Sequence, residues 1–173
     1  MMNNFKEDLK RVRAFIFDLD GVVSSHILFL DPSGIPLRSV NMKDAYAIQL
    51  AIRKKYPLAM ISGSVSRAFK WRMKRLGVKD IYLGAMNKMI PFREFLNKHN
   101  LSEADVLYMG DDLPDLEVMK TVGFPTCPAD AVTEVKQISR YISHFNGGEG
   151  CVRDVIEQVL RLHQKWMDGD VNI

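Results

Sequence analysis

The sequence has few features of an extracellular or membrane protein. It contains only two cysteines, Cys127 and Cys151, and their separation does not match the spacing of metal-binding cysteines. No apolar run approaches the length needed to span a membrane. Residues 1–13 are polar and charged, unlike a signal peptide. We therefore expect a protein of the reducing cytoplasm that has no membrane partner.

The sequence also lacks a strong excess of charge of one sign. Its 24 Lys and Arg against 21 Asp and Glu give a net charge of +3. Basic residues gather between Arg67 and Lys79, but the other face of this segment is apolar, which is typical of a solvated helix rather than a nucleic-acid site. We expect no nucleic-acid partner. The length of 173 residues, without repeats, predicts one domain covering residues 1–173.

Short apolar runs typical of β-strands recur along the chain. They lie at residues 14–17, 58–61, 80–83, 106–109, 124–127 and 141–143. Helical periodicity fills most of the intervals, most clearly at residues 44–55 and 65–76, and a last apolar stripe predicts a C-terminal helix at about residues 151–166. This alternation predicts an α/β fold, with a parallel sheet between flanking helices.

The segment between the first strand and the first long helix predicts a β-hairpin at about residues 26–40. Apolar runs at 27–30 and 35–37 flank Asp31-Pro32-Ser33-Gly34, in which proline and glycine occupy favoured turn positions. The segment is too short for a second domain. Its apolar residues exceed what an isolated two-stranded ribbon shields, so we expect the hairpin to contact another surface.

Two aspartates, Asp18 and Asp20, follow the first strand directly and precede Gly21. The strand would place both at the carboxyl edge of the sheet, where open α/β sheets bind ligands. Like charges this close raise each other's pKa unless a cation or hydrogen-bond donors hold them, so the pair indicates a shared Mg²⁺. The alternative is an ordinary turn, because Asp-Gly is a common turn dipeptide.

Two further strand ends carry polar residues. Ser62, Gly63 and Ser64 precede a predicted helix and suit phosphate binding, although an ordinary helix N-cap explains them equally well. A third strand ends in three carboxylates, which favour a bound cation. These carboxylates belong to Asp111, Asp112 and Asp115. Lys88, taken alone, is better explained as a surface charge.

The order of these motifs resembles that of the haloacid dehalogenase superfamily of aspartate-nucleophile phosphatases. Residues 41–48, 83–88, 110–115 and 147–153 are similar to its 3-deoxy-D-manno-octulosonate 8-phosphate phosphatase group. The resemblance covers residues 12–162 and includes no cap-domain insertion. It implies a capless Rossmann-like fold, a homotetramer and a role in lipopolysaccharide biosynthesis. The implied reaction is hydrolysis of an eight- or nine-carbon ulosonic acid phosphate.

The resemblance also assigns a role to each motif. Asp18 would be the nucleophile and Asp20 the general acid and base, with Mg²⁺, or Mn²⁺, held by Asp18, Asp111 and the Asp20 carbonyl. Phosphoryl contacts would come from Ser62, Gly63 and Lys88, with Asp20 also facing the substrate.

Other residues would act in support. Asp112 would position metal-bound water, and Asp115 would position Lys88. We expect the glycine-rich segment 147–150 to be flexible enough to reach a neighbouring subunit, where Arg153 would contact that subunit's substrate.

The sequence departs from the group at two motifs. Residues 23–26 read Val-Ser-Ser-His where members often have Leu-Thr-Asp-Gly, and residues 62–64 read Ser-Gly-Ser in place of Thr-Gly-Arg. Whether Arg67 replaces the missing arginine stays open, as does the choice between eight- and nine-carbon substrates. A receiver-like, non-catalytic phosphate-binding module is the alternative of a different class. Asp20 argues against it, because a long-lived aspartyl-phosphate needs no second acid.

Overall fold

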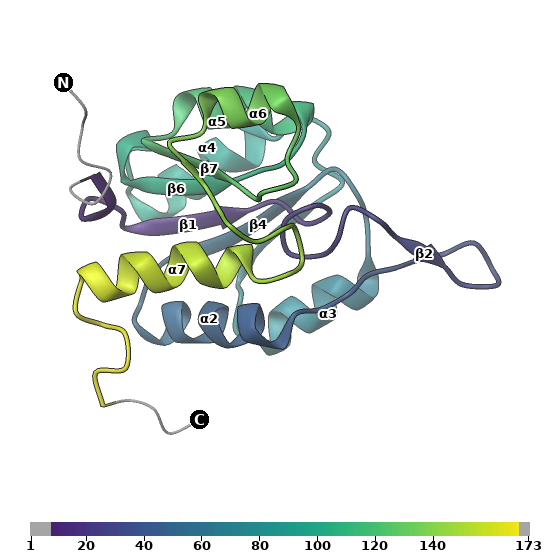
Figure 1. The fold of residues 1–173 in the computed structure, drawn as a ribbon, viewed down its shortest axis with the longest axis horizontal. Helices are drawn as coiled ribbons and strands as arrows, with labels where there is room; N and C mark the ends of the chain where they lie inside the picture. The colour runs from purple at the N-terminus through teal and green to yellow at the C-terminus, as the bar shows by residue number, and fades with distance from the viewer. Residues whose placement is uncertain (1–7, 170–173) are drawn as a thin grey trace.

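The structure, a computed structural model, describes residues 8–169 and contains a six-stranded sheet in the order β5-β4-β1-β6-β7-β8 (Figure 1). All neighbouring strands in this sheet run parallel. The strands are β1 (Ala14–Phe17), β4 (Leu58–Ser62), β5 (Asp80–Leu83), β6 (Val106–Met109), β7 (Phe124–Cys127) and β8 (Tyr141–Ile142). The predicted parallel α/β fold is confirmed, and strand bounds differ by at most one residue.

Helices cover both faces of the sheet. Figure 1 shows α2, α3 and α7 on one face and α4, α5 and α6 on the other. Their bounds are α2 (Met42–Arg53), α3 (Arg67–Arg75), α4 (Met89–His99), α5 (Leu116–Thr121), α6 (Thr133–Ile138) and α7 (Cys151–Leu162), with short 3-10 helices η1 (Glu103–Asp105) and η2 (Leu113–Asp115). No helix among residues 8–169 is long and apolar enough to cross a membrane.

Strand β1 serves two hydrophobic cores because its successive side chains face opposite ways. Phe15 and Phe17 belong to the core beneath α2 and α7, whereas Ala14 and Ile16 belong to the core beneath α4. The strand is therefore buried on both faces, as expected for the middle of a parallel sheet. Its rigid setting fixes the position of the residues that follow it.

Helix α2 lies two residues earlier than the predicted 44–55. Two further helix boundaries differ from the sequence prediction for local reasons. Helix α3 begins at Arg67 rather than residue 65, because the Ser66 hydroxyl accepts a hydrogen bond from the Phe69 amide and caps the helix. Helix α7 ends at Leu162 rather than residue 166. Gln164 has a positive φ, and the Lys165 amide donates back to the Leu160 carbonyl at 2.8 Å, a common helix-ending motif.

The predicted hairpin is present as antiparallel strands β2 (Phe29–Leu30) and β3 (Pro36–Leu37), and it projects from the body of the molecule (Figure 1). The Asp31 carboxylate accepts from the Ser33 and Ile35 amides and so closes the turn. Five of its large apolar side chains are more than half exposed, namely Ile27, Phe29, Leu30, Ile35 and Leu37. Between β1 and α2 the chain holds this hairpin and no cap domain.

A buried carboxylate joins helices α2 and α7. Asp44 Oδ1 accepts from the Arg153 amide at 2.7 Å, while Oδ2 has no partner among the described residues. Burial raises the pKa of Asp44 to about 6, although hydrogen bonds from the Arg153 and Gly150 amides oppose the rise. Because the unfolded chain ionises at lower pH, the folded state is favoured while Asp44 is protonated. This contribution is lost as the pH rises through about 6.

We therefore expect Asp44→Asn to flatten the dependence of stability on pH. Between pH 4 and 7 the free energy of unfolding of the parent should fall by about 2 kcal/mol relative to that of the variant, since one pKa unit corresponds to about 1.4 kcal/mol. Urea unfolding of both proteins at several pH values measures the difference, and titrations common to both cancel. Parallel stability curves for the two proteins would contradict the assignment.

Candidate active site

The carboxyl ends of the adjacent strands β4, β1 and β6 meet at one edge of the sheet and form a pocket of about 360 Å³. All the predicted catalytic, phosphoryl-contacting and supporting residues outside the C-terminal helix line this pocket, namely Asp18, Asp20, Ser62, Gly63, Lys88, Asp111, Asp112 and Asp115. The topology therefore brings together residues that lie up to about a hundred positions apart, as expected for an open parallel sheet.

Three carboxylates crowd together at the base of the pocket. Asp18, Asp111 and Asp115 each place an oxygen within 4.8 Å of the others. Burial, reinforced by the charge of Asp115, raises the pKa of Asp18 to about 7 against the opposing effect of Lys88. Burial and the charges of Asp18 and Asp115 raise the pKa of Asp111 to about 8. The raised pKa values show that the negative charge of the three carboxylates exceeds the positive charge that Lys88 supplies.

These carboxylates fit a hard divalent cation. Asp111 Oδ1 is buried and accepts no hydrogen bond from any described residue, which leaves a lone pair directed at no donor. Gly21 allows this carboxylate to approach, since a Cβ at that position would lie 1.9 Å from Asp111 Oδ2 and its φ is +90°. Oxygen-only ligands of this kind suit Mg²⁺ or Mn²⁺.

Lys88 lies inside the site rather than on the surface. Its Nζ is 2.8 Å from Asp18 Oδ1 and 2.7 Å from Asp115 Oδ1, and the side chain is buried. Burial alone would lower the pKa of Lys88, but the charges of the two aspartates raise it overall. The Tyr108 hydroxyl, which the sequence did not single out, also donates to Asp115 at 2.5 Å. Lys88 is therefore held as a fixed positive charge beside Asp18.

Ser62 is buried at the end of β4 and does not cap a helix. Its Oγ lies 2.9 Å from Ser64 Oγ and accepts from the Ser64 amide at 3.1 Å. The alternative that made these residues an ordinary helix N-cap is wrong, because Ser66 caps α3. The phosphate-binding interpretation therefore rests on the Ser62 hydroxyl and the turn, without free helix N–H groups.

Arg38, which the sequence analysis did not identify, forms a bidentate ion pair with Asp20. Its Nε lies 2.7 Å from Asp20 Oδ1 and its Nη2 lies 2.8 Å from Oδ2. Nη2 also donates to Ser64 Oγ at 3.2 Å, and only 9% of the Arg38 side chain is exposed. Burial would raise the pKa of Asp20, but the hydrogen bonds and charge of Arg38 lower it overall. No motif spacing marks this arginine, which follows the second hairpin strand.

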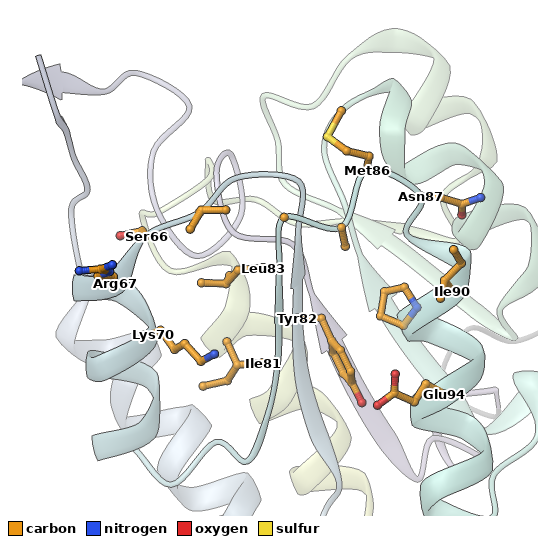
Figure 2. Close-up of a pocket in the computed structure, with 14 residues that line it drawn as sticks. Ser66, Arg67, Lys70, Ile81, Tyr82, Leu83, Met86, Asn87, Ile90 and Glu94 are labelled. Atoms are coloured by element: carbon orange, nitrogen blue, oxygen red, sulfur yellow. The ribbon is translucent and has the colours of Figure 1, made fainter.

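Arg67 does not line the acid pocket. It lines a separate groove of about 810 Å³ between α3 and α4, with β5 as its floor (Figure 2). Arg67 and Lys70 line this groove on the α3 side, and Asn87, Ile90 and Glu94 line it on the α4 side (Figure 2). The groove is larger than the acid pocket, but it contains none of the clustered carboxylates. The clustered carboxylates therefore make the smaller pocket the candidate active site.

The expectation for the glycine-rich segment is wrong in one respect. Gly148 donates its amide to the Val22 carbonyl at 2.8 Å, and a Cβ on Gly147 would lie 2.0 Å from the Gly21 carbonyl oxygen. The segment is therefore packed against the loop that follows Asp20 and is not free to extend. Arg153 pairs with Glu157 at 3.1 Å and lies outside the acid pocket of its own chain. Its contact with a neighbouring subunit stays a prediction.

Comparison with known proteins agrees with this geometry. The sequence profile of the haloacid dehalogenase-like hydrolases matches residues 43–156. The 3-deoxy-D-manno-octulosonate 8-phosphate phosphatase of Salmonella typhi is 34% identical over 151 residues, which cover 87% of this chain and 80% of that protein.

Solved structures give the same result. The phosphatase of the same name from Yersinia pestis superposes with a TM-score of 0.91 at 30% identity, covering 95% of this chain and 89% of that one. The Moraxella catarrhalis enzyme, in complex with magnesium ion, phosphate ion and KDO, superposes with a TM-score of 0.88 at 28% identity, covering 94% and 93%. This chain therefore belongs to the haloacid dehalogenase-like hydrolases, in the group of 3-deoxy-D-manno-octulosonate 8-phosphate phosphatases.

Proposed function

We propose that the protein is a Mg²⁺-dependent phosphomonoesterase that hydrolyses 3-deoxy-D-manno-octulosonate 8-phosphate to the free sugar acid and phosphate. The observation that carries this proposal is a pocket in which Asp18, held by Lys88, lies among the carboxylates that follow two adjacent parallel strands, β1 and β6. The substrate named for the Salmonella relative and the KDO in the Moraxella structure support the choice of sugar acid.

Asp18 would attack the phosphorus in line, forming a bond from its carboxylate oxygen to phosphorus while the bond to the sugar oxygen breaks. Asp20 would give a proton to the leaving sugar oxygen. It would then take a proton from the water that attacks the aspartyl-phosphate, which releases phosphate and restores Asp18. One difficult displacement is thereby divided into two easier ones.

The remaining residues would bind and orient. Lys88, Ser62 and Gly63 would hold the phosphoryl oxygens, and Asp115 would keep Lys88 in place through the 2.7 Å contact. Asp112 accepts from the Leu113 amide at 2.8 Å, so its support of metal-bound water would come from a fixed turn. Mg²⁺ held by Asp18, Asp111 and the Asp20 carbonyl would offset the repulsion between a carboxylate and a phosphate dianion.

Phosphate release from a panel of sugar phosphates, each with Mg²⁺, tests the proposal. The octulosonate 8-phosphate should give a kcat/KM at least about tenfold above hexose phosphates, a ratio worth about 1.4 kcal/mol of transition-state binding. A higher kcat/KM for a nine-carbon ulosonic acid 9-phosphate would mean that this compound, and not the octulosonate 8-phosphate, is the substrate. Stable phosphorylation without turnover would favour the receiver-like alternative instead.

We further propose that the protein is one domain and works as a cytoplasmic homotetramer. Both hydrophobic cores share one sheet, which supports a single domain. Cys127 and Cys151 are both buried free thiols, as suits a reducing compartment. The exposed apolar hairpin supports assembly, because a two-stranded ribbon of this kind is marginally stable alone. A neighbouring subunit would also shield the open pocket from water.

Charged substitutions on the hairpin test the assembly. Phe29 is 75% exposed, and Phe29→Lys or Leu28→Lys should dissociate the tetramer and lower activity together, because a buried unpaired charge is costly. Light scattering at the assay concentration measures the mass. Met167→Lys, at another exposed apolar position, is the control and should leave both properties unchanged. A fully active monomer of the parent protein would contradict the proposal.

A further inference from the structure

The carboxylate of Asp20 has no free hydrogen-bonding position in this structure. Oδ1 accepts from Arg38 Nε at 2.7 Å and from Ser24 Oγ at 3.0 Å. Oδ2 accepts from Arg38 Nη2 at 2.8 Å and from Ser64 Oγ at 3.0 Å. A carboxylate offers about four lone-pair positions. To exchange a proton with the leaving oxygen or with water, Asp20 must therefore lose at least one of these partners.

Arg38 is the partner best placed to leave. Ser24 is completely buried, and its hydroxyl lies near the Leu19 carbonyl of the same tight loop. Ser64 is tied to Ser62 through both its amide and its hydroxyl. Arg38, in contrast, has a long side chain and follows the projecting hairpin, and among residues 8–169 its side chain donates hydrogen bonds to Asp20 and Ser64 alone. Release of Arg38 would free a position on both oxygens of Asp20.

A phosphate group in the pocket would give Arg38 a new partner nearby. A continuous chain of contacts runs from Ser62 Oγ to Ser64 Oγ at 2.9 Å and from Ser64 Oγ to Arg38 Nη2 at 3.2 Å. The guanidinium therefore lies one hydroxyl away from Ser62, the proposed phosphoryl ligand. Its planar pair of donors matches a phosphate as well as it matches a carboxylate, and a dianion attracts it more strongly.

We propose that Arg38 is a phosphate-binding residue. In the absence of substrate its guanidinium pairs with Asp20, and when substrate binds it leaves Asp20 and pairs with the phosphoryl group. The transfer would supply a cation next to Ser64 in the acid pocket, which Arg67 does not line. It would also free Asp20 to face the leaving oxygen. The role of Asp20 in this inference rests on the proposed function, but the binding of phosphate by Arg38 does not.

Calorimetric titration of the Mg²⁺-loaded full chain with inorganic phosphate tests the transfer. Arg38→Met, which keeps the length of the side chain without its charge, should weaken phosphate binding at least about tenfold, as expected for loss of a charge-assisted pair. Arg67→Met is the matched control and should bind phosphate as the parent does. Inhibition by the free sugar acid should change less than about threefold in Arg38→Met, because that ligand carries no phosphate.

Two results would overturn the inference. One is unchanged phosphate affinity in Arg38→Met. The other is an equal loss of affinity for phosphate and for the free sugar acid, which would mean that Arg38 only shapes the pocket. If Arg38→Met does not fold, Arg38→Gln is measured in the same way. Failure of the parent to hydrolyse the octulosonate phosphate would refute the proposed substrate, while the phosphate titration would still decide the role of Arg38.

Discussion

Asp18→Asn should lower steady-state phosphate release by at least about a thousandfold, the scale typical of losing a catalytic nucleophile. The amide has nearly the same shape as the carboxylate, but its oxygen is a poor nucleophile toward phosphorus. Asn Oδ1 can still accept the 2.8 Å hydrogen bond from Lys88, so the local contacts remain. Initial rates with the octulosonate phosphate at saturating Mg²⁺ measure the loss.

The fold should survive this substitution. Removing the charge of Asp18 from three crowded carboxylates relieves repulsion, so the thermal midpoint without metal should shift by no more than a few degrees. Asp20→Asn provides a contrast, since attack by Asp18 is retained while hydrolysis is impaired, and phosphate should accumulate on Asp18. Turnover of Asp18→Asn within about tenfold of the parent, or phosphate on another residue, would refute the assignment.

Complete removal of divalent cations should abolish activity. Asp18 and Asp115 are buried beside the partly buried Asp111, whose Oδ1 has no partner among the described residues, so the site lacks the positive charge needed to accept a phosphate dianion. Treatment with EDTA followed by dialysis should leave no measurable turnover, and Mg²⁺ or Mn²⁺ should restore it. Ca²⁺ should bind yet inhibit, because its larger and looser coordination misplaces the reacting oxygens.

A second measurement does not depend on activity. Mg²⁺ should raise the thermal midpoint of the parent, because a ligand that binds only the folded state stabilises it. Asp111→Asn should lose most of this increase, whereas Asp31→Asn, in the exposed hairpin turn, should keep it. Full activity after exhaustive metal removal would exclude the proposed metal role. An unchanged Mg²⁺ response in Asp111→Asn would remove this residue from the ligand set.

The sequence by itself determined the parallel sheet and the core of the active site. Apolar runs of strand length alternate with segments of helical periodicity. A parallel sheet covered by helices on both faces is the arrangement that buries the apolar residues of both kinds of segment. Parallel strands end at a common edge, so Asp18, Ser62 and Asp111, each at the end of such a run, had to lie near one another. Local periodicity and strand direction were sufficient for this conclusion.

Only the tertiary structure decided which side chains complete the site. Lys88 has the sequence context of a surface lysine, yet packing of α4 buries it between Asp18 and Asp115. Arg38 belongs to no recognisable motif and follows the hairpin, but the path of the chain after the hairpin brings its guanidinium into contact with the Asp20 carboxylate. Such contacts join segments remote in sequence. They depend on side-chain directions and loop paths that packing fixes, and local periodicity carries no information about either.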